Sequence, residues 1–159
     1  MQPRLDISKI APAAYQAMAG LEGFVRRSLH NDAALLELIK MRASQLNGCA
    51  YCIDMHSKDA RAKGESEQRL YALNAWRETP FFTERERAAL AWTEAITLIG
   101  QDHAPDQVYE EVRPHFSDEE LVSLTMAIVA INGWNRLAIG FRAVPGEYQP
   151  RQEAHSSAH

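Results

Sequence analysis

Hydrophobic residues recur along almost the whole chain at spacings of three and four positions, which is the period of an amphipathic helix. The first segment carries such a stripe, formed by Ile10, Ala14, Met18, Leu21, Val25 and Leu29. Pro12, Gly20 and Gly23 are the positions at which this segment could break. Runs that alternate hydrophobic and polar residues, as half-buried strands do, are missing. The pattern therefore predicts an all-α protein with a single domain over residues 1–148.

Capping residues set the expected boundaries of the helices. Asn31 has the character of an N-cap and Gly64 that of a C-terminal cap, while capping boxes begin at Thr83 and Ser117. The expected helices span about residues 7–29, 31–46, 49–63, 67–76, 83–100, 105–114 and 117–141. The periodicity then ends, and we expect residues 149–159 to form a polar, flexible tail.

The last predicted helix, residues 117–141, is the most hydrophobic segment of the chain. Its hydrophobic side chains cover nearly the whole circumference, so the helix must be buried on all sides. In a domain of this size, that pattern indicates a subunit interface as well as a core. We therefore expect a homo-oligomer.

Composition and charge argue against several classes of protein. The chain has 159 residues and a formal net charge of −4, with scattered Lys and Arg, so it lacks the basic face of a nucleic-acid-binding protein. The first residues lack the apolar run of a signal peptide, and no stretch of about 18 uncharged apolar residues could span a bilayer. The glycine fingerprint of a dinucleotide-binding fold is missing. We expect a cytoplasmic protein with no nucleic-acid or membrane partner and no bound nicotinamide or flavin.

Both cysteines of the chain lie in one short motif, Cys49-Ala50-Tyr51-Cys52, and His56 follows four residues later. On a helix that begins at Cys49, the two thiols and the imidazole share one face. In the first turn, unpaired N–H groups and the helix dipole lower the pKa of a thiol. Cysteines in a reducing cytoplasm are more often catalytic or metal-binding than structural. This motif is therefore our candidate for thiol redox chemistry.

Glu37 joins the motif if the preceding helix folds back across Asn47-Gly48 as an antiparallel hairpin. Glu37 lies about ten residues before the turn and His56 about nine after it, so the two side chains reach similar heights. The expected relay is carboxylate, imidazole and thiol. Glu37 orients or deprotonates His56, which takes the proton from a cysteine, directly or through a water.

Other interpretations of these residues stay open at this level. The two cysteines could be small buried hydrophobic side chains. A zinc ion could be held by Cys49, Cys52, His56 and Glu37, although the chain offers no second Cys or His pair of the kind that structural zinc sites use, and we expect no metal. Trp134 could pack in the core or an interface, or it could shape a substrate pocket.

At these residues the chain resembles the carboxymuconolactone decarboxylase superfamily, and within it the alkyl hydroperoxidase D-like branch. The resemblance rests on Glu37, eleven intervening residues, the Cys49–Cys52 pair and His56. It rests on residues 35–73, 83–90 and 134–136, and the span between the first and last of these covers most of the chain.

The resemblance implies roles for four residues. Cys52 is the thiol that a peroxide attacks and oxidises to a sulfenic acid, and Cys49 is the proton donor and resolving thiol. His56 and Glu37 form the relay that activates them. The implied protein is an all-helical trimer or hexamer and an antioxidant enzyme that reduces organic hydroperoxides without a bound cofactor. An external dithiol, from a protein or a lipoyl-type group, reopens the Cys49–Cys52 disulfide.

One position departs from the best-studied peroxidases of this branch, which carry a histidine immediately before the second cysteine. This chain has Tyr51 there. A phenol near neutral pH donates a hydrogen bond but is not a base, so turnover could be slower or the substrate different. The rival activity is a muconolactone-type decarboxylase, which needs no cysteine pair but requires anion-binding residues such as Arg42 or Arg136 at the pocket. A non-catalytic, zinc-stabilised oligomer is the remaining alternative.

Overall fold

The computed structural model describes residues 1–150, and within them the chain is all-helical, as the hydrophobic period predicts. The α-helices are α1 (Ile7–Ile10), α2 (Pro12–Ser28), α3 (Ala33–Asn47), α4 (Ala50–Ala62), α5 (Glu67–Ala72), α6 (Glu84–Thr97), α7 (Ile99–Asp102), α8 (Asp106–Val112) and α9 (Asp118–Phe141). Short 3-10 helices are η1 (His30–Asp32), η2 (Leu73–Glu78) and η3 (Arg113–His115). Most of the expected polar tail, residues 151–159, lies outside the described residues.

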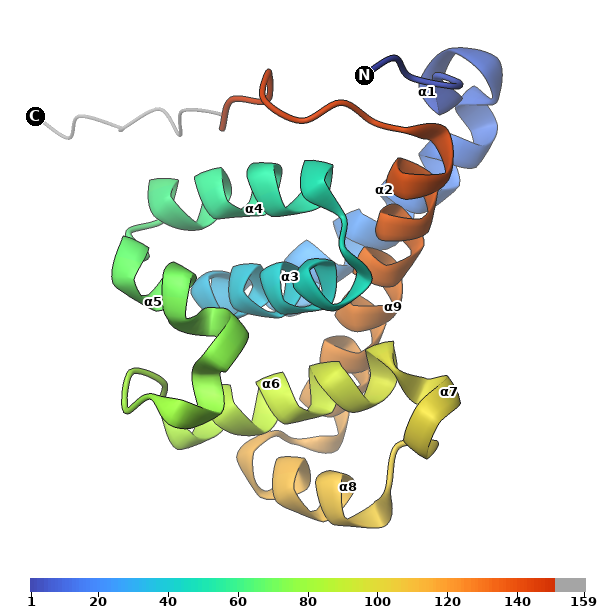
Figure 1. The fold of residues 1–159 in the computed structure, drawn as a ribbon. Coiled ribbons are helices and arrows are strands. Elements are labelled where there is room, and N and C mark those ends of the chain that lie inside the picture. Colours follow the sequence, from blue (N-terminus) through green and yellow to red (C-terminus); the bar gives the residue numbers. More distant parts are fainter. Residues whose placement is uncertain (151–159) are drawn as a thin grey trace, which may run out of the picture.

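Helix α3 lies at the centre of the molecule, and α4 packs along its outer side as the second arm of a hairpin (Figure 1). Gly48 makes the turn, because its φ of +68° is a left-handed conformation that glycine adopts without steric cost. Its N–H donates to the Gln45 carbonyl, and the Cys49 N–H donates to the Ser44 carbonyl, which satisfies the end of α3. Gly64 closes α4 in the same way, with φ +93°, so the cap predicted there is confirmed.

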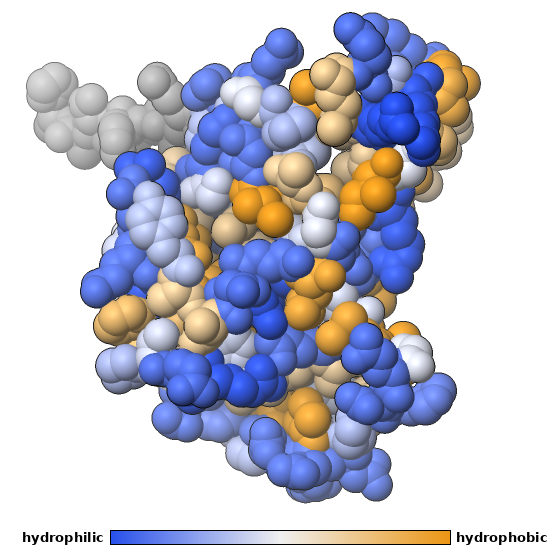
Figure 2. Space-filling model, viewed as in Figure 1, coloured by the Kyte–Doolittle hydropathy of each residue, from blue (hydrophilic) through white to orange (hydrophobic). Residues whose placement is uncertain are grey.

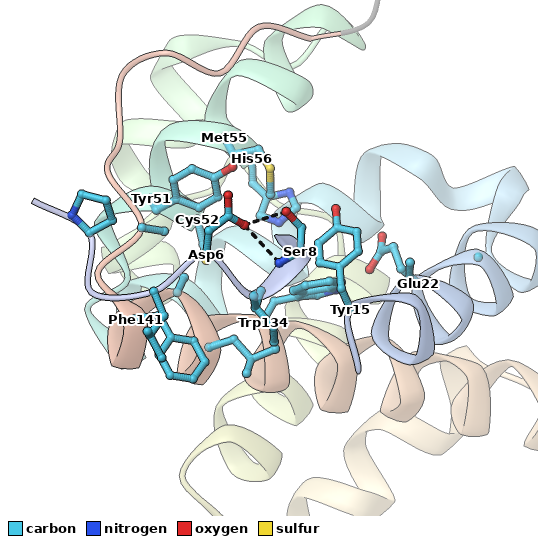
Figure 3. A pocket seen from close by; sticks show the side chains of 18 of the residues that line it. Asp6, Ser8, Tyr15, Glu22, Tyr51, Cys52, Met55, His56, Trp134 and Phe141 are labelled. Carbon is cyan, nitrogen blue, oxygen red and sulfur yellow. Dashed lines mark hydrogen bonds between the residues drawn. The ribbon is translucent and has the colours of Figure 1, made fainter. Parts of the chain in front are cut away.

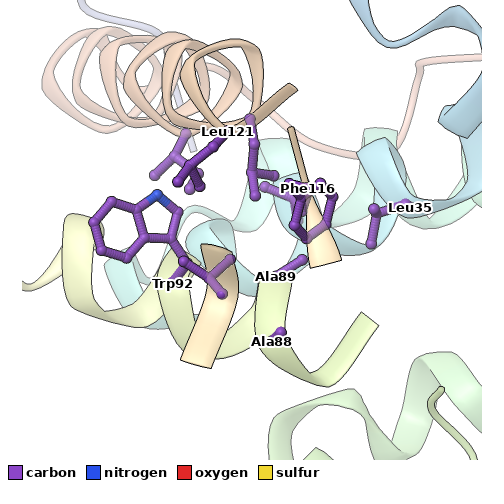
Figure 4. Packing of buried hydrophobic residues seen from close by; sticks show 10 residues of the cluster. Leu35, Ala88, Ala89, Trp92, Phe116 and Leu121 are labelled. Atoms are coloured by element: carbon purple, nitrogen blue, oxygen red, sulfur yellow. The ribbon is translucent and has the colours of Figure 1, made fainter. Parts of the chain in front are cut away.

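The long helix α9 crosses the hairpin and packs against α2, α3 and α6 (Figure 1). Figure 4 shows the cluster that fixes part of this arrangement, where Trp92 and Ala89 of α6 meet Leu121 of α9 and Leu35 of α3. Burying a large apolar side chain contributes about 1.5–3 kcal/mol, so clusters of this kind hold α9 in register with the hairpin. Both predicted capping boxes, at the starts of α6 and α9, are present.

The single chain leaves part of the surface of α9 exposed. Within the single chain, Val122 is 61% and Val129 is 47% exposed, so the helix is not buried on all sides. By length and composition α9 is also the one helix in the described part that could cross a membrane, with a mean hydropathy of 1.2 over its best window. Its uncharged stretch, residues 121–135, is nevertheless shorter than 18 residues. Core helices of water-soluble proteins pass the same test, and 44% of this window is buried inside the molecule. The face in Figure 2 is largely hydrophilic, with hydrophobic side chains in small groups.

Several predicted boundaries are wrong. Asn31 does not cap α3, because η1 intervenes and α3 begins at Ala33 without a side-chain cap. Gly20 and Gly23 leave α2 unbroken, since packing of the helix outweighs the weak helix propensity of glycine. The break at Pro12 is confirmed, and this proline stands in the first turn of α2, where its missing N–H costs nothing.

The middle of the chain is more interrupted than the pattern predicts. The α-helix expected over residues 67–76 ends at Ala72 and continues as 3-10 helix with a kink at Ala75. The next one ends at Thr97, and α7 forms a separate turn behind it. The helix that opens after Pro105 ends at Val112, two residues before the ring of a second proline interrupts the hydrogen-bond ladder.

Candidate active site

The two thiols lie at the start of α4. Cys49 is the N-cap of this helix rather than a residue of its first turn, and its sulfur accepts a hydrogen bond from the Cys52 N–H at 3.4 Å. Both cysteines are unpaired by disulfides and 1% exposed. The N-cap faces the unpaired N–H groups of the helix, so the lowering of a thiol pKa expected from the sequence still applies at this position.

The thiols do not ionise equally. A hydrogen bond from the Cys52 thiol lowers the pKa of Cys49 to about 7 despite burial, which acts in the opposite direction, and the N–H of Cys52 and the side chain of Asn135 lower it further. The same thiol–thiol contact and burial raise the pKa of Cys52 far above its usual range. Cys49 is therefore the thiol that ionises first.

Glu37 and His56 meet as predicted. The distance from His56 Nδ1 to Glu37 Oε2 is 2.9 Å, and the residues are only 4% and 2% exposed. Burial alone would raise the pKa of Glu37, but the hydrogen bond and charge of His56, the charge of Lys40 and a hydrogen bond from Lys63 lower it to about 2. An ionised carboxylate only accepts, so Nδ1 carries the hydrogen, and Nε2 of a neutral ring is left as a base.

A cavity of about 710 Å³ opens onto Cys52 and His56 (Figure 3). Its walls come from the N-terminal segment, α2, α4 and α9, and include Asp6, Tyr15, Glu22, Tyr51, Met55 and Trp134. Cys49 and Glu37 do not line it. A ligand in this cavity therefore meets the Cys52 sulfur and the His56 ring, with the second thiol and the carboxylate behind them.

Aromatic side chains shape the cavity. Trp134 packs edge-on against Tyr15, with the ring centroids 5.5 Å apart, so this tryptophan is part of a pocket wall. Tyr51 lines the cavity beside Cys52, and burial raises the pKa of its phenol. Tyr51 thus remains a hydrogen-bond donor, as expected from the sequence.

A polar network behind the thiols was not predicted. Asn135 is fully buried; its Nδ2 donates to Ser44 Oγ at 3.0 Å, and its Oδ1 accepts from Asn47 Nδ2 at 2.9 Å. Asn47 also donates to Asn132 Oδ1 at 2.9 Å, so the hairpin turn is tied to α9. A signal existed in the sequence: asparagines in the most hydrophobic helix must find buried partners. The contact of Lys63 with Glu37 was not predicted either. The signal for it is that Lys63 follows His56 by seven residues, so both lie on the same face of the helix.

The structure does not assemble the four zinc ligands that the sequence allowed. In the described part of the chain, the group of possible metal ligands is Glu37, His56 and Asp59, whose ligand atoms lie within 4.8 Å of one another, and it contains no cysteine. Both oxygens of Glu37 already have donors, from His56 and Lys63. These contacts favour a proton relay over a metal centre.

The two arginines named for the decarboxylase alternative lie away from the cavity, which Arg26 lines instead. Arg42 donates to Glu94 at 2.8 Å and to Asn74 at 2.7 Å, whereas Arg136 is hydrogen-bonded to Asn132 on its own helix. Neither arginine lines the cavity. Neither arginine therefore meets the requirement of the decarboxylase alternative for an anion-binding group at the pocket.

Sequence comparisons give one family and several uncharacterised relatives. The model of the carboxymuconolactone decarboxylase family matches residues 12–95. The uncharacterised protein YdfG of Bacillus subtilis is 46% identical over 139 residues, which are 87% of this chain and 94% of that protein. The uncharacterised protein YnjA of Escherichia coli is 29% identical over 97 residues, 61% of this chain and 53% of that protein.

Solved structures share the fold. A protein of unknown function from Agrobacterium tumefaciens, described as a putative antioxidant defence protein AhpD, superposes with a TM-score of 0.85 at 46% identity, over 95% of this chain and all of that one. The debrominase Bmp8 has a TM-score of 0.76 at 24% identity, over 86% of this chain and 73% of that one. The second likeness is one of fold alone.

Proposed function

This chain belongs to the carboxymuconolactone decarboxylase family, with an AhpD-like fold, and we propose that it is a cysteine-based peroxidase that reduces organic hydroperoxides. The observation that supports this proposal most is the layered arrangement at the cavity. Cys52 and His56 face the cavity, and a thiol with a lowered pKa, Cys49, lies directly behind Cys52. Glu37 orients the imidazole.

In the resting enzyme His56, directly or through a water, takes one proton from the thiol pair, and the negative charge resides mainly on Cys49. When a hydroperoxide occupies the cavity, the remaining thiol proton passes from Cys52 to Cys49, and the Cys52 sulfur attacks the terminal oxygen. The O–O bond breaks, Cys52 becomes a sulfenic acid, and the leaving alkoxide takes the proton from Cys49 to form the alcohol.

The second step closes the disulfide. Cys49, again a thiolate, attacks the sulfur of the Cys52 sulfenic acid, and the S–O bond breaks. The departing hydroxide takes the proton that His56 holds and leaves as water. An external dithiol, from a protein or a lipoyl-type group, then reduces the disulfide by exchange. Such a cycle needs reduced thiols at its start, so the cytoplasm is part of this proposal.

Single cysteine variants test the assignment of roles. In Cys52→Ser, hydroperoxide consumption is expected to vanish, with no sulfenic acid trapped. In Cys49→Ser, one equivalent reacts slowly and stops, because the sulfenic acid on Cys52 has no resolving thiol. Mass spectrometry locates the oxidised sulfur. Because Cys49 has the lower pKa, the test must distinguish Cys49 from Cys52 as the thiol that the peroxide oxidises. A sulfenic acid on Cys49 in the Cys52 variant, with none on Cys52 in the other, reverses the roles, and full activity in both ends the thiol hypothesis.

The alternatives have their own readouts in the same samples. A muconolactone-type decarboxylase would keep its activity in a variant that lacks both thiols. A non-catalytic, zinc-stabilised oligomer would contain zinc in elemental analysis and would show no loss of free thiols after one equivalent of hydroperoxide.

A further inference from the structure

Glu37 is an anion shared between two donors. Its Oε2 lies 2.9 Å from His56 Nδ1, and its Oε1 accepts a hydrogen bond from Lys63 Nζ. The Glu37 side chain is 3% exposed, whereas that of Lys63 is 36% exposed. Lys63 is the C-cap residue of α4, so its side chain reaches from the molecular surface to a buried carboxylate.

We propose that Lys63 is a positioning residue of the thiol site. Its ammonium group fixes the Glu37 carboxylate and weakens the attraction of this carboxylate for a proton on His56, so that the imidazole remains available as a base. The inference rests on the proposed function in one respect, because the need for a base arises from the peroxidase cycle.

The influence of Lys63 on His56 is electrostatic. A buried imidazole beside an ionised carboxylate that has no other cation holds its proton firmly and then no longer serves as a base near neutral pH. The Lys63 ammonium acts against this in two ways: it attracts the charge of Glu37, and it repels a proton on His56. Both effects have the same sign, so removing the ammonium raises the proton affinity of the ring.

The charge of Lys40 also lowers the pKa of Glu37, but Lys40 does not make the contact with the carboxylate that Lys63 makes. The other titratable groups near Glu37 and His56 are Glu22 and Arg26 on α2, Lys40 on α3, Cys52 and Asp59 on α4, and Tyr148 beyond α9. Lys40 is hydrogen-bonded to Glu22, and Asp59 accepts from the Tyr148 hydroxyl at 2.8 Å. Lys63 is thus the lysine that holds the second oxygen of Glu37.

The test compares Lys63→Met with Lys63→Arg, which keeps the charge, and with Arg61→Met as a matched control. Arg61 is an exposed cation at the same end of α4, and it pairs with Glu67 rather than with the relay. The His56 ring is followed by NMR across the pH range, with its signal assigned by loss in a His56 variant. The oxidation rate of the thiols is measured over the same range, and thiolate absorbance reports Cys49 separately.

In Lys63→Met, the midpoint of the His56 titration is expected to rise by about one pH unit, and the acid limb of the oxidation rate should move with it. Lys63→Arg and Arg61→Met should resemble the parent protein, and the Cys49 titration should stay in place. Lys63→Gln serves as a second neutral variant if the methionine does not fold.

A rate that falls equally at every pH, with an unmoved His56 midpoint, would show a merely structural lysine and overturn the inference. A Lys63→Met profile that matches Arg61→Met would do the same. The NMR titration needs no substrate, so a parent protein that consumes no hydroperoxide refutes the proposed function while the role of Lys63 is still decided.

Discussion

At the scale of single residues, the behaviour of the two thiols depends on partners that they gain only in the folded protein. Their place at the start of α4, ahead of His56, follows from the spacing of the motif. The order in which they ionise does not follow from it, because that order depends on the contact between the sulfurs and on Asn135, which lies 83 positions after Cys52. By spacing alone Cys52 has the closer base, whereas in the structure Cys49 is the more acidic thiol.

Replacement of Asn135 by alanine tests this network. The change removes the donor to Ser44 Oγ and the acceptor of one Asn47 N–H, and it is expected to reduce the free energy of unfolding by about 1–3 kcal/mol. It should also raise the pKa of Cys49 above about 7, because one of the hydrogen bonds that lower it is lost. Urea unfolding and the thiolate absorbance measure the two effects. Asn31→Ala, at an exposed position, is the control and should change neither; an Asn135 variant as stable as the control would contradict the account.

The lowered pKa of Glu37 predicts that the stability of the fold depends on pH. Its pKa is lowered from 4.5 to about 2 in the folded protein, so the ionised carboxylate stabilises the fold above about pH 4.5, and this contribution is lost as the pH falls through about 2. Its size is on the order of 3 kcal/mol. In Glu37→Gln that part of the acid dependence should disappear, as measured by urea unfolding between about pH 5 and pH 2. The exposed Glu147→Gln is the control, and identical acid profiles in the two variants would refute the prediction.

At the scale of helices, local signals predict well where the physics is local. The capping boxes, the left-handed Gly48 and Gly64, and the first-turn Pro12 depend on residues within one turn, and the structure has all of them. The similar distances of Glu37 and His56 from the turn at Asn47-Gly48 also predicted that the two side chains meet, as they do in the structure. The prediction of an N-cap at Asn31 is wrong because η1 precedes α3, and nothing within one turn of Asn31 indicates that interruption.

A pair of glycines separates backbone strain from helix propensity. Gly48 has a φ of +68° and open space where a Cβ atom would lie, so Gly48→Ala should destabilise the hairpin by roughly 1–2 kcal/mol through backbone strain alone. Gly20 has equally open surroundings but lies inside α2, so Gly20→Ala should stabilise the protein by about 0.5–1 kcal/mol. Thermal and urea unfolding measure both. Effects of the same sign would show that the turn at Gly48 does not need its left-handed conformation.

At the scale of the whole molecule, the cavity was beyond prediction because its walls meet only through tertiary packing. The N-terminal segment, α2, α4 and α9 contribute to it, and no local pattern relates Tyr15 to Trp134 across more than a hundred positions. The motif therefore indicated the candidate residues, whereas the fold determines that Cys52 lines the cavity and Cys49 does not. The same limit applies to Lys63, whose contact with Glu37 depends on how α4 lies along α3.

The last prediction concerns assembly. Val122 and Val129 stand seven residues apart on α9, so they lie on the same face, and both are exposed in the single chain. Exposed β-branched side chains on so hydrophobic a helix are typical of a subunit interface, and we expect a homo-oligomer, a trimer or hexamer. Val122→Glu combined with Val129→Glu should shift the protein toward monomers in light scattering while its helical circular dichroism persists, because neither side chain belongs to the buried core. Tyr71→Glu, a substitution of equal character at an exposed site of α5, should leave the assembly intact. A parent protein that is already monomeric at micromolar concentration would remove the interface from α9 altogether.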